Sequence, residues 1–565
     1  MTMLSPVTPR RRTVYTPLAE TWQPSEKAGF LATHAEEFSE EEEEYFDPRG
    51  SEEGNHLSGY KLVALMFALG LSVFLVALDN TIIDTAVPKI TDEFGSLNDV
   101  GWYSSAYLLT TAGTQLLFGK FYTHFSVKRV YIISIILFEL GSFVCGAAPS
   151  SSIFIIGRAI AGVGNAGIFS GGLVIIAHTV PLAKRPIFGG MLGGLGGIGS
   201  VTGPLLGGVI TEKFSFRYCF YLSLPIGLLA LVITQYFLNI RAPGLVKGES
   251  TAKLADFDPY GNLVFVPAMV MLLLAVQWGG TLLPWSSGLI ITLLLASVIL
   301  LVIFIYIQLW AGERATIPPR IIKQRTLWSS SLYAICIGGA FNIITMCLPI
   351  WFQVIHGDSP EDSGLDTLPV ILALVGGAIC AGALVGAIGY YTPFMLLSSV
   401  CVVMGSGLLS SLTVSATPAN WLLGEILCGF GVGLGLQEPV LAAQTVLELK
   451  DVPVGTALVM FANTLGGALF VAIAQSVFTS SLVAGLVATV PGVSPKIVLS
   501  DGANSLKEVI APEYLPAVLA EYNHAIMMSF YVALALGIVA FAGSCAVEWR
   551  SVKEKRGEME MTFVA

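Results

Sequence analysis

The chain has 565 residues, of which 54% are hydrophobic and only 12% are charged, and its formal net charge is −10. That charged fraction is about half of what a soluble domain carries, and a mean hydropathy of +0.75 is too high for one water-soluble core. The eight cysteines stand singly with no C-x-x-C pair, so the sequence indicates neither a metal site nor a disulfide framework.

The excess negative charge lies at the beginning of the chain. Residues 1–59 hold twelve acidic against five basic side chains, including the run Glu40–Glu44, and few apolar residues. Such a segment cannot bury enough apolar surface to fold, so we expect residues 1–59 to form a disordered, acidic, cytosolic tail. A cleaved signal peptide combines a charged stretch with a short apolar region after it, and we find no such pattern at the start of this sequence. We therefore expect no cleaved signal peptide.

Apolar runs of about 20 residues recur along the rest of the chain, and each is long enough to cross a bilayer as a helix. We therefore expect an all-α polytopic membrane protein. The fourteen predicted spans lie near 60–86, 98–119, 129–148, 153–178, 186–210, 217–238, 258–278, 287–309, 328–354, 366–390, 393–412, 420–447, 455–482 and 523–547.

The basic residues of the predicted loops orient these spans. Lys and Arg concentrate on the side that holds both termini, which the positive-inside rule assigns to the cytosol. The predicted inner loops hold Lys120, Lys128, Arg129, Lys184, Arg185, Arg241, Lys247, Lys253, Arg314, Arg320, Lys323, Arg325 and Lys450, and the outer loops hold Lys89, Lys213, Arg217, Lys496 and Lys507.

The spacing of the spans predicts two six-helix bundles, at 60–238 and 328–547. A linker at 239–327 carries two extra helices, an extracellular polar loop covers 483–522, and a basic cytosolic tail covers 548–565. Two six-helix halves around a midplane site are a transporter architecture.

The strongest motif lies in the predicted fifth span, where small residues follow one another at helical spacing. Glycine removes side-chain bulk and lets a neighbouring helix approach backbone to backbone, and a proline bends the helix locally. We expect a gating and packing role for Gly199, Gly203, Pro204, Gly207 and Gly208.

This motif, in this span, resembles the antiporter motif of the major facilitator superfamily. Further stretches support the resemblance in the same order along the chain: 78–83, 157–162, 219–227, 348–353, 450–453 and 466–470. From about residue 70 to about residue 545 the chain resembles the fourteen-span drug:proton antiporter branch, in its fungal toxin-efflux form. The resemblance implies a monomeric transporter of small organic molecules, not an enzyme, that uses the proton motive force and no other cofactor.

Three ionisable side chains inside the first four predicted spans are candidates for proton coupling. Asp79 lies in the outer half of the first span and Arg158 at a similar depth in the fourth. A charge at such depth is costly unless it is paired or protonated, and arginine stays charged. We expect Asp79 and Arg158 to form a proton-coupling site, with Glu139 of the third span as a second acid within reach. A purely structural ion pair, or a structural hydrogen bond of Glu139, is the alternative.

Polar and aromatic residues of the second half predict the lining of a substrate cavity. Gln437, Leu441 and Gln444 follow i, i+4, i+7 spacing and so share a helix face, and Pro439 would open the helix beside Glu438. The predicted lining is Asn80, Asn342, Gln353, Gln437, Glu438, Gln444, Trp351 and Phe461. Glu425 is a further polar residue of the same span as Gln437, and Trp278 and Phe352 are further apolar candidates.

The cytoplasmic loop after the second span keeps the glycine and the bases of the superfamily signature. They are Gly119, Lys120, Lys128 and Arg129. Thr123 stands where the family usually has Asp, and Ser126 where it has Gly, so the usual charge latch is in doubt.

These observations favour a proton-coupled antiporter that exports amphipathic organic molecules, such as secondary metabolites, mycotoxins or drugs, by alternating access. No G-x-x-x-x-G-K-[ST] loop is present, so we do not expect ATP-driven pumping. An uptake permease for siderophores or amino acids, or a transporter-like nutrient sensor, are the alternatives. The expected location is the plasma membrane, with the vacuolar membrane as the second choice.

Overall fold

The computed structural model describes residues 59–96, 99–238, 254–280, 283–490, 498 and 510–553. The chain divides at Gly54 and Asn55, and every described residue belongs to the second unit. The predicted acidic tail therefore lies outside the described residues up to residue 58. So do most of the first linker connector, the centre of the polar loop 483–522, and residues 554–565 of the C-terminal tail.

The regular elements of the described part are helical, apart from two isolated bridges. The first group of helices comprises α3 (Tyr60–Phe94), α4 (Val100–His124), α5 (Val127–Ala147), α6 (Ser151–Thr179), η3 (Leu182–Lys184), α7 (Arg185–Lys213), α8 (Arg217–Tyr221) and α9 (Ser223–Phe237). The middle segments are η4 (Leu254–Phe257), α10 (Pro259–Trp278), α11 (Gly288–Ala311), η5 (Gly312–Arg314) and α12 (Pro319–Ile322). The last group comprises α13 (Arg325–Trp351), η6 (Phe352–His356), α14 (Pro360–Asp366), α15 (Leu368–Ile388), α16 (Thr392–Leu409), α17 (Pro418–Gly435), α18 (Glu438–Val446), α19 (Val452–Thr489) and α22 (Leu515–Ala546).

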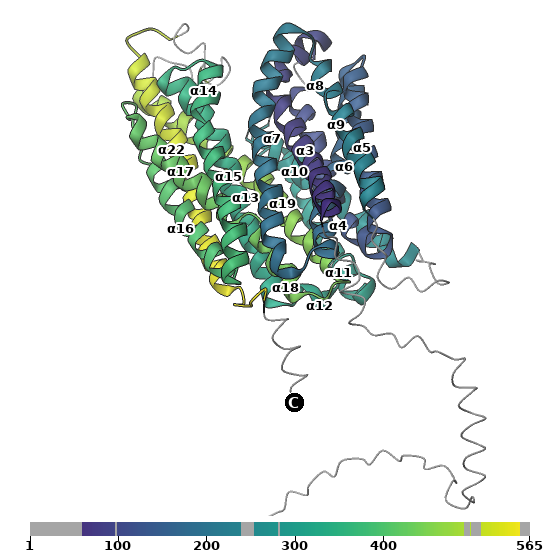
Figure 1. Ribbon diagram of the computed structural model, residues 1–565. Coiled ribbons are helices and arrows are strands. Elements are labelled where there is room, and N and C mark those ends of the chain that lie inside the picture. Colours follow the sequence, from purple (N-terminus) through teal and green to yellow (C-terminus); the bar gives the residue numbers. More distant parts are fainter. Residues whose placement is uncertain are drawn as a thin grey trace, which may run out of the picture. The chain divides into compact units, whose positions relative to one another are not determined.

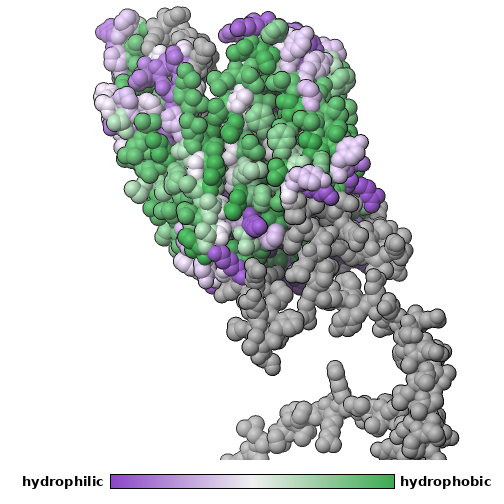
Figure 2. All heavy atoms as spheres, viewed as in Figure 1, coloured by the Kyte–Doolittle hydropathy of each residue, from purple (hydrophilic) through white to green (hydrophobic). Residues whose placement is uncertain are grey.

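Thirteen helical segments of the described residues are long and apolar enough to cross a membrane, so the chain is an integral membrane protein. Figure 2 shows the corresponding surface, with apolar residues over most of the helical region and polar residues toward its two ends. Every predicted span has a helix in its place, but α4 is missing from these thirteen. Much of α4 is buried against other helices, so it needs less apolar surface than a lipid-facing span. Fourteen spans stay a prediction.

The helices pack in two groups (Figure 1). In the first group α3 packs along α7, and α6 packs against both α4 and α5. In the second group α17 packs against α15 and α16, and α13 packs against α19 and α22. The groups meet where α7 contacts α15 and α4 contacts α19. Helix α10 packs against both α4 and α19, and α11 packs on α10.

A buried aspartate holds the ends of the inserted helices together. Asp258 precedes α10 in a left-handed conformation, with φ of 47°. Its carboxylate accepts hydrogen bonds from Gly261 N at 2.8 Å, from Gln308 Nε2 at 2.5 Å and from Thr316 N at 2.9 Å. Because these donors come from α10, from α11 and from the segment after η5, one side chain fixes the geometry of the insertion.

Two predicted boundaries differ from the structure. The polar loop predicted at 483–522 is shorter, because α19 continues to Thr489 and α22 begins at Leu515. The span predicted at 420–447 is two helices, α17 and α18, interrupted at residues 436–437. Pro439 lies in the first turn of α18, where its missing N–H costs no helical hydrogen bond.

Candidate functional site

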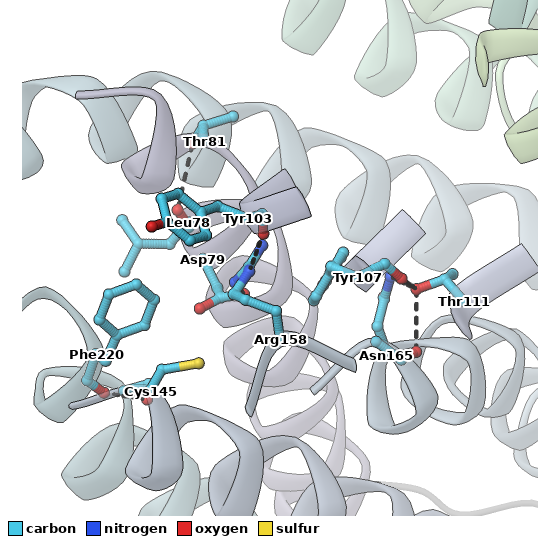
Figure 3. A network of polar contacts seen from close by, with 12 residues as sticks. Leu78, Asp79, Thr81, Tyr103, Tyr107, Thr111, Cys145, Arg158, Asn165 and Phe220 are labelled. Carbon is cyan, nitrogen blue, oxygen red and sulfur yellow. Dashed lines mark hydrogen bonds and ion pairs between the residues drawn. The ribbon is translucent and has the colours of Figure 1, made fainter. Parts of the chain in front are cut away.

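A buried ion pair joins α3 to α6 in the first group of helices. Asp79 Oδ2 lies 2.6 Å from Arg158 Nη1, and the two side chains are 5% and 0% exposed (Figure 3). The prediction that these side chains lie together is therefore correct. A charged pair removed from water is retained only with close geometry, because each ion has lost its hydration.

Arginine 158 is also held by α4. Its Nε donates to the Tyr103 carbonyl oxygen at 2.9 Å, and its guanidinium lies 4.4 Å from the centre of the Tyr107 ring. Its Nη2 has no hydrogen-bond partner among the described residues. The cation is thus fixed by a carbonyl and an aromatic face, while its charge is balanced by one carboxylate, that of Asp79 (Figure 3).

The glycines of α7 fix the helix that carries Asp79. A Cβ atom on Gly199 would lie 2.6 Å from the Phe74 carbonyl oxygen, and one on Gly203 would collide with Thr81. Gly207 meets Thr85 and Ile82 in the same way. These close approaches flank Asp79 on α3, so the motif sets the position of the acid relative to Arg158.

Two other members of the motif do not make this contact. Nothing lies within 4 Å of a Cβ atom built on Gly208, so the prediction that this glycine takes part in the close packing is wrong. Pro204 lies on the exposed side of α7, and the helix continues through it.

Glu139 lies on the α5 face that packs against α9, and its carboxyl is close enough to Asp79 for the two groups to interact electrostatically. A Cβ atom on Gly227 would overlap its carboxylate, so the absence of a side chain there makes room for it. Neither of its oxygens has a hydrogen-bond partner among the described residues. The structure shows no contact between Glu139 and Arg158.

The break between α17 and α18 brings the predicted polar residues of that span to one small pocket. It lies where α18 meets α6 and α7, and Gln444 Nε2 donates to the Leu173 carbonyl oxygen of α6 at 3.4 Å. The pocket is lined by Leu173, Ile176, Arg185, Pro186, Gly189, Gln437, Glu438, Val440, Leu441 and Gln444. Gln437, Glu438 and Gln444 are therefore neighbours, as their spacing predicts.

The remaining predicted cavity residues are spread elsewhere. Trp351 is fully buried and donates to Asn523 Oδ1 at 2.8 Å, and Phe461 packs on Phe265 with ring centres 5.4 Å apart. Both fill the helix core, so their assignment to an open cavity is not supported in this conformation. Gln353 lies near Ser363, at the other end of the second group from Gln437.

Three further candidates have separate surroundings. Asn342 is exposed and donates to the Gly338 carbonyl oxygen of its own helix at 2.8 Å. Asn80 is exposed beside the buried Asp79. The ring of Trp278 packs edge-to-face against the ring of Trp102 in α4, with ring centres 5.7 Å apart.

The signature loop after α4 packs against the second group without a charge latch at Thr123. A Cβ atom on Gly119 would lie 2.8 Å from Ala457 Cβ of α19, so the first glycine permits a close helix contact. Thr123 bonds to its own helix, donating to the Gly119 carbonyl oxygen at 2.9 Å.

The bases of this loop have separate roles. Lys120 is 3% exposed and makes no ion pair among the described residues. Lys128 donates to the Gln235 carbonyl oxygen at 2.5 Å, and Arg129 is exposed. Other residues form ion pairs on this side, among them Arg320 and Asp451, which lie 2.9 Å apart.

Sequence reasoning missed the two tyrosines that fix Arg158. Tyr103 and Tyr107 are spaced by one helical turn on α4 and are almost completely buried. For Tyr107 the signal was an aromatic ring in an apolar span, since a ring face attracts a guanidinium. Tyr103 acts through its backbone carbonyl, which no residue type marks in a sequence.

The comparisons with known proteins agree with this architecture. The sequence model of the family described as "Major Facilitator Superfamily" matches residues 69–471 of this chain. The "MFS-type efflux pump MFS1" of Arthroderma benhamiae is 49% identical over 89% of this chain and 94% of its own. The "Efflux pump roqT" of Penicillium rubens is 47% identical over 88% and 92%, and the "Efflux pump aflT" of Aspergillus parasiticus is 44% identical over 90% and 99%.

Solved structures share the fold at low sequence identity. The proton:xylose symporter XylE superposes with a TM-score of 0.56 at 14% identity, covering 87% of this chain and 97% of that one. The human organic anion transporter MFSD10 gives a TM-score of 0.53 at 14% identity, covering 84% and 100%. With the family match over most of the helical region and relatives above 40% identity along nearly the whole chain, the protein belongs to the Major Facilitator Superfamily and is a membrane transporter, not an enzyme.

Proposed function

We propose that this transporter exports amphipathic organic molecules from the cytosol in exchange for protons. Curated relatives that match along most of its length are named efflux pumps, among them the "Aspyridones efflux protein" of Neocamarosporium betae. The observation that supports proton exchange is the buried pair of Asp79 and Arg158, since it is a titratable acid at the meeting point of three helices.

The pair can link protonation to conformation because protonation removes the charge on one partner. When Asp79 binds a proton, its attraction to Arg158 falls and α3 is held to α6 less strongly. Because Gly199, Gly203 and Gly207 place α7 directly on this part of α3, a shift of α3 is passed to α7. Helix α7 also packs on α15 of the second group, so the shift reaches the interface between the two groups.

The described contacts between the groups include several near one end of the helices. There Gly119 of α4 meets α19, and a Cβ atom on Gly190 of α7 would collide with the Ala378 carbonyl oxygen of α15. By the distribution of basic residues this end faces the cytosol. We infer that the structure represents a state closed to the cytosol, and that substrate enters when these contacts separate.

The energy required is modest. If one proton is exchanged for one neutral solute, a proton gradient of about 1.4 kcal/mol is enough to accumulate the solute tenfold. No nucleotide site is needed for that step, and we propose the plasma membrane as the location in which such a gradient drives export.

Reconstituted vesicles test the proposal with rhodamine 6G as an amphipathic probe. An imposed pH gradient should drive dye transport by the native protein, and Asp79→Asn or Arg158→Ala should remove the dependence on the gradient. Lys128→Gln is the control and should keep the native rate, because the hydrogen bond described for Lys128 goes to the backbone carbonyl of Gln235 in α9, away from the ion pair. Gradient-driven transport at the native rate by both Asp79→Asn and Arg158→Ala would refute the assignment.

A further inference from the structure

The two groups of helices are related by an internal repeat that appears in their helix boundaries. Helix α6 covers Ser151–Thr179, and adding 267 to both numbers gives 418 and 446, the first residue of α17 and the last of α18. The same addition takes Arg185, where α7 begins, to Val452, where α19 begins.

The repeat also holds in the close contacts between neighbouring helices. A Cβ atom on Gly164 of α6 would collide with the Phe138 amide of α5, and one on Gly431 of α17 would lie 3.0 Å from the Val402 amide of α16. Gly162 meets the Tyr107 carbonyl oxygen of α4, as Gly429 meets the Val370 carbonyl oxygen of α15.

One position in this repeat carries opposite charges in the two groups. Gly157 and Gly424 are equivalent, so the residues that follow them, Arg158 and Glu425, are equivalent as well. Each is the eighth residue of its segment, about 10 Å along the helix at 1.5 Å per residue. The second group thus has an acid where the first has the buried guanidinium.

The partner of that position is missing from the second group. Gly199 of α7 meets the Phe74 carbonyl oxygen of α3, and Gly466 of α19 meets the Ile335 carbonyl oxygen of α13. Five residues further along these helices stand Asp79 and Ala340. An ion pair in the first group therefore corresponds to an alanine and a lone carboxyl in the second.

Glutamate 425 is completely buried, and neither of its oxygens has a hydrogen-bond partner among the described residues. Helices α15, α16 and α17 carry no Lys, Arg or His, and the other titratable groups of these three helices are Cys380, Cys401 and Cys428. The basic residue of α13 is Arg325, at the opposite end of that helix. No cation on the helices packed against α17 is therefore placed to balance an ionised Glu425.

Three acids lie at and before α14, and one of them interacts electrostatically with this carboxyl. Asp362 is exposed, Asp358 and Asp366 are partly buried, and Asp366 is the charged group that acts on Glu425. Asp366 interacts with Asp358, Asp362 and His356 at the end of α14. Asp366 therefore connects Glu425, which has no hydrogen-bond partner among the described residues, electrostatically with groups that are exposed or partly exposed.

We propose that Glu425 is a second proton-binding site of this transporter, separate from the pair formed by Asp79 and Arg158. In the conformation described here Glu425 is the neutral acid, with an O–H bond made from a proton that entered from water past Asp366. That proton returns to water when the helices rearrange and Glu425 becomes hydrated. A structural role would require hydrogen bonds that Glu425 does not make here. Its contribution to transport rests on the proposed proton coupling, which would then involve two protons.

Infrared difference spectroscopy of the full-length protein in liposomes tests the site without a substrate. Between about pH 5 and about pH 9, the native protein should lose a protonated-carboxyl band that is absent from Glu425→Gln. Glu438→Gln, which alters a buried acid of the neighbouring helix, should keep that band, and so should Asp79→Asn. Asp366→Asn, which leaves Glu425 intact, should move the pH midpoint of the band.

A band that is identical in the native protein and Glu425→Gln would overturn the proposal, as would a Glu425 band that is constant over the whole pH range. If Glu425→Gln does not fold, an unchanged midpoint in Asp366→Asn overturns it instead. In vesicles with rhodamine 6G, Glu425→Gln should reduce the number of protons exchanged per dye by one, and an unchanged ratio contradicts the role in transport. Loss of coupling in Asp79→Asn is measured separately. Failure of the proposed coupling at Asp79 and Arg158 can therefore be distinguished from failure of the proposed proton site at Glu425.

Discussion

The two groups of helices treat a buried charge in different ways. In the first group Asp79 meets Arg158 at 2.6 Å, and the cation is further fixed by Tyr103 and Tyr107. In the second group Glu425 stands at the position equivalent to Arg158 and has no partner among the described residues. The same backbone frame thus supports a charged pair in one half and a neutral acid in the other. An acid inside a transporter can thus be accommodated by a cation or by a proton.

The largest expected effect comes from removing one member of the charged pair. Arg158→Met leaves Asp79 buried without its cation, and breaking a buried pair in this way costs about 3–5 kcal/mol. Thermal unfolding of the purified protein in detergent should show a large fall in the midpoint. Because Asp79→Asn with Arg158→Gln removes both charges, the double variant should recover most of the loss. A double variant less stable than Arg158→Met would contradict the pairing.

The next effect concerns the glycines that hold α3 in place. Gly203→Leu introduces a side chain where even a Cβ atom collides with Thr81, and overpacking of this kind costs about 1–3 kcal/mol. Gradient-driven rhodamine 6G transport should fall, because the larger side chain moves α3 relative to α7. No atom lies within 4 Å of a Cβ atom built on Gly208, so Gly208→Leu should transport normally. Equal rates in the two variants would show that the close approach is unimportant.

A smaller effect is expected at Glu425, and it distinguishes the two halves. Glu425→Gln replaces a neutral acid with an amide of nearly the same shape, so the thermal midpoint at neutral pH should stay the same or rise. This is opposite in sign to Arg158→Met, although the two positions are equivalent in the repeat. A fall in the midpoint as large as that of Arg158→Met would indicate that Glu425 is ionised and paired.

The smallest effect is expected outside the membrane, at the pair of Arg320 and Asp451. Arg320 is 42% exposed and Asp451 is 11% exposed, so water screens the interaction. The Asp451 carboxylate accepts hydrogen bonds from Arg320 and raises the pKa of its guanidinium. Asp451→Asn should cost no more than about 1 kcal/mol, and this cost should shrink in high salt. If Asp451→Asn instead lowered the free energy of unfolding by several kcal/mol at every salt concentration, the pair of Arg320 and Asp451 would behave like the buried pair of Asp79 and Arg158.

The sequence predicted the ion pair because Asp79 and Arg158 carry opposite charges at a similar depth in the first and fourth predicted spans. It also predicted the shared position of Gln437, Glu438 and Gln444, although the helix is broken before α18 rather than continuous. Aromatic residues were harder, because Trp351 and Phe461 look alike in the sequence whether they face a cavity or fill a core. Glu425 was noted only as a polar residue, since its meaning depends on the repeat of Gly157 and Gly424, which the inserted helices separate.

The most direct measurement of the central claim compares two modes of transport in one preparation. Vesicles containing Asp79→Asn should exchange labelled for unlabelled rhodamine 6G at a rate close to that of the native protein, because exchange requires no net proton movement. The same vesicles should fail to accumulate the dye against its gradient when a pH gradient is imposed. Accumulation equal to that of the native protein would contradict the account, because the proton gradient would then drive dye transport without the carboxyl group of Asp79.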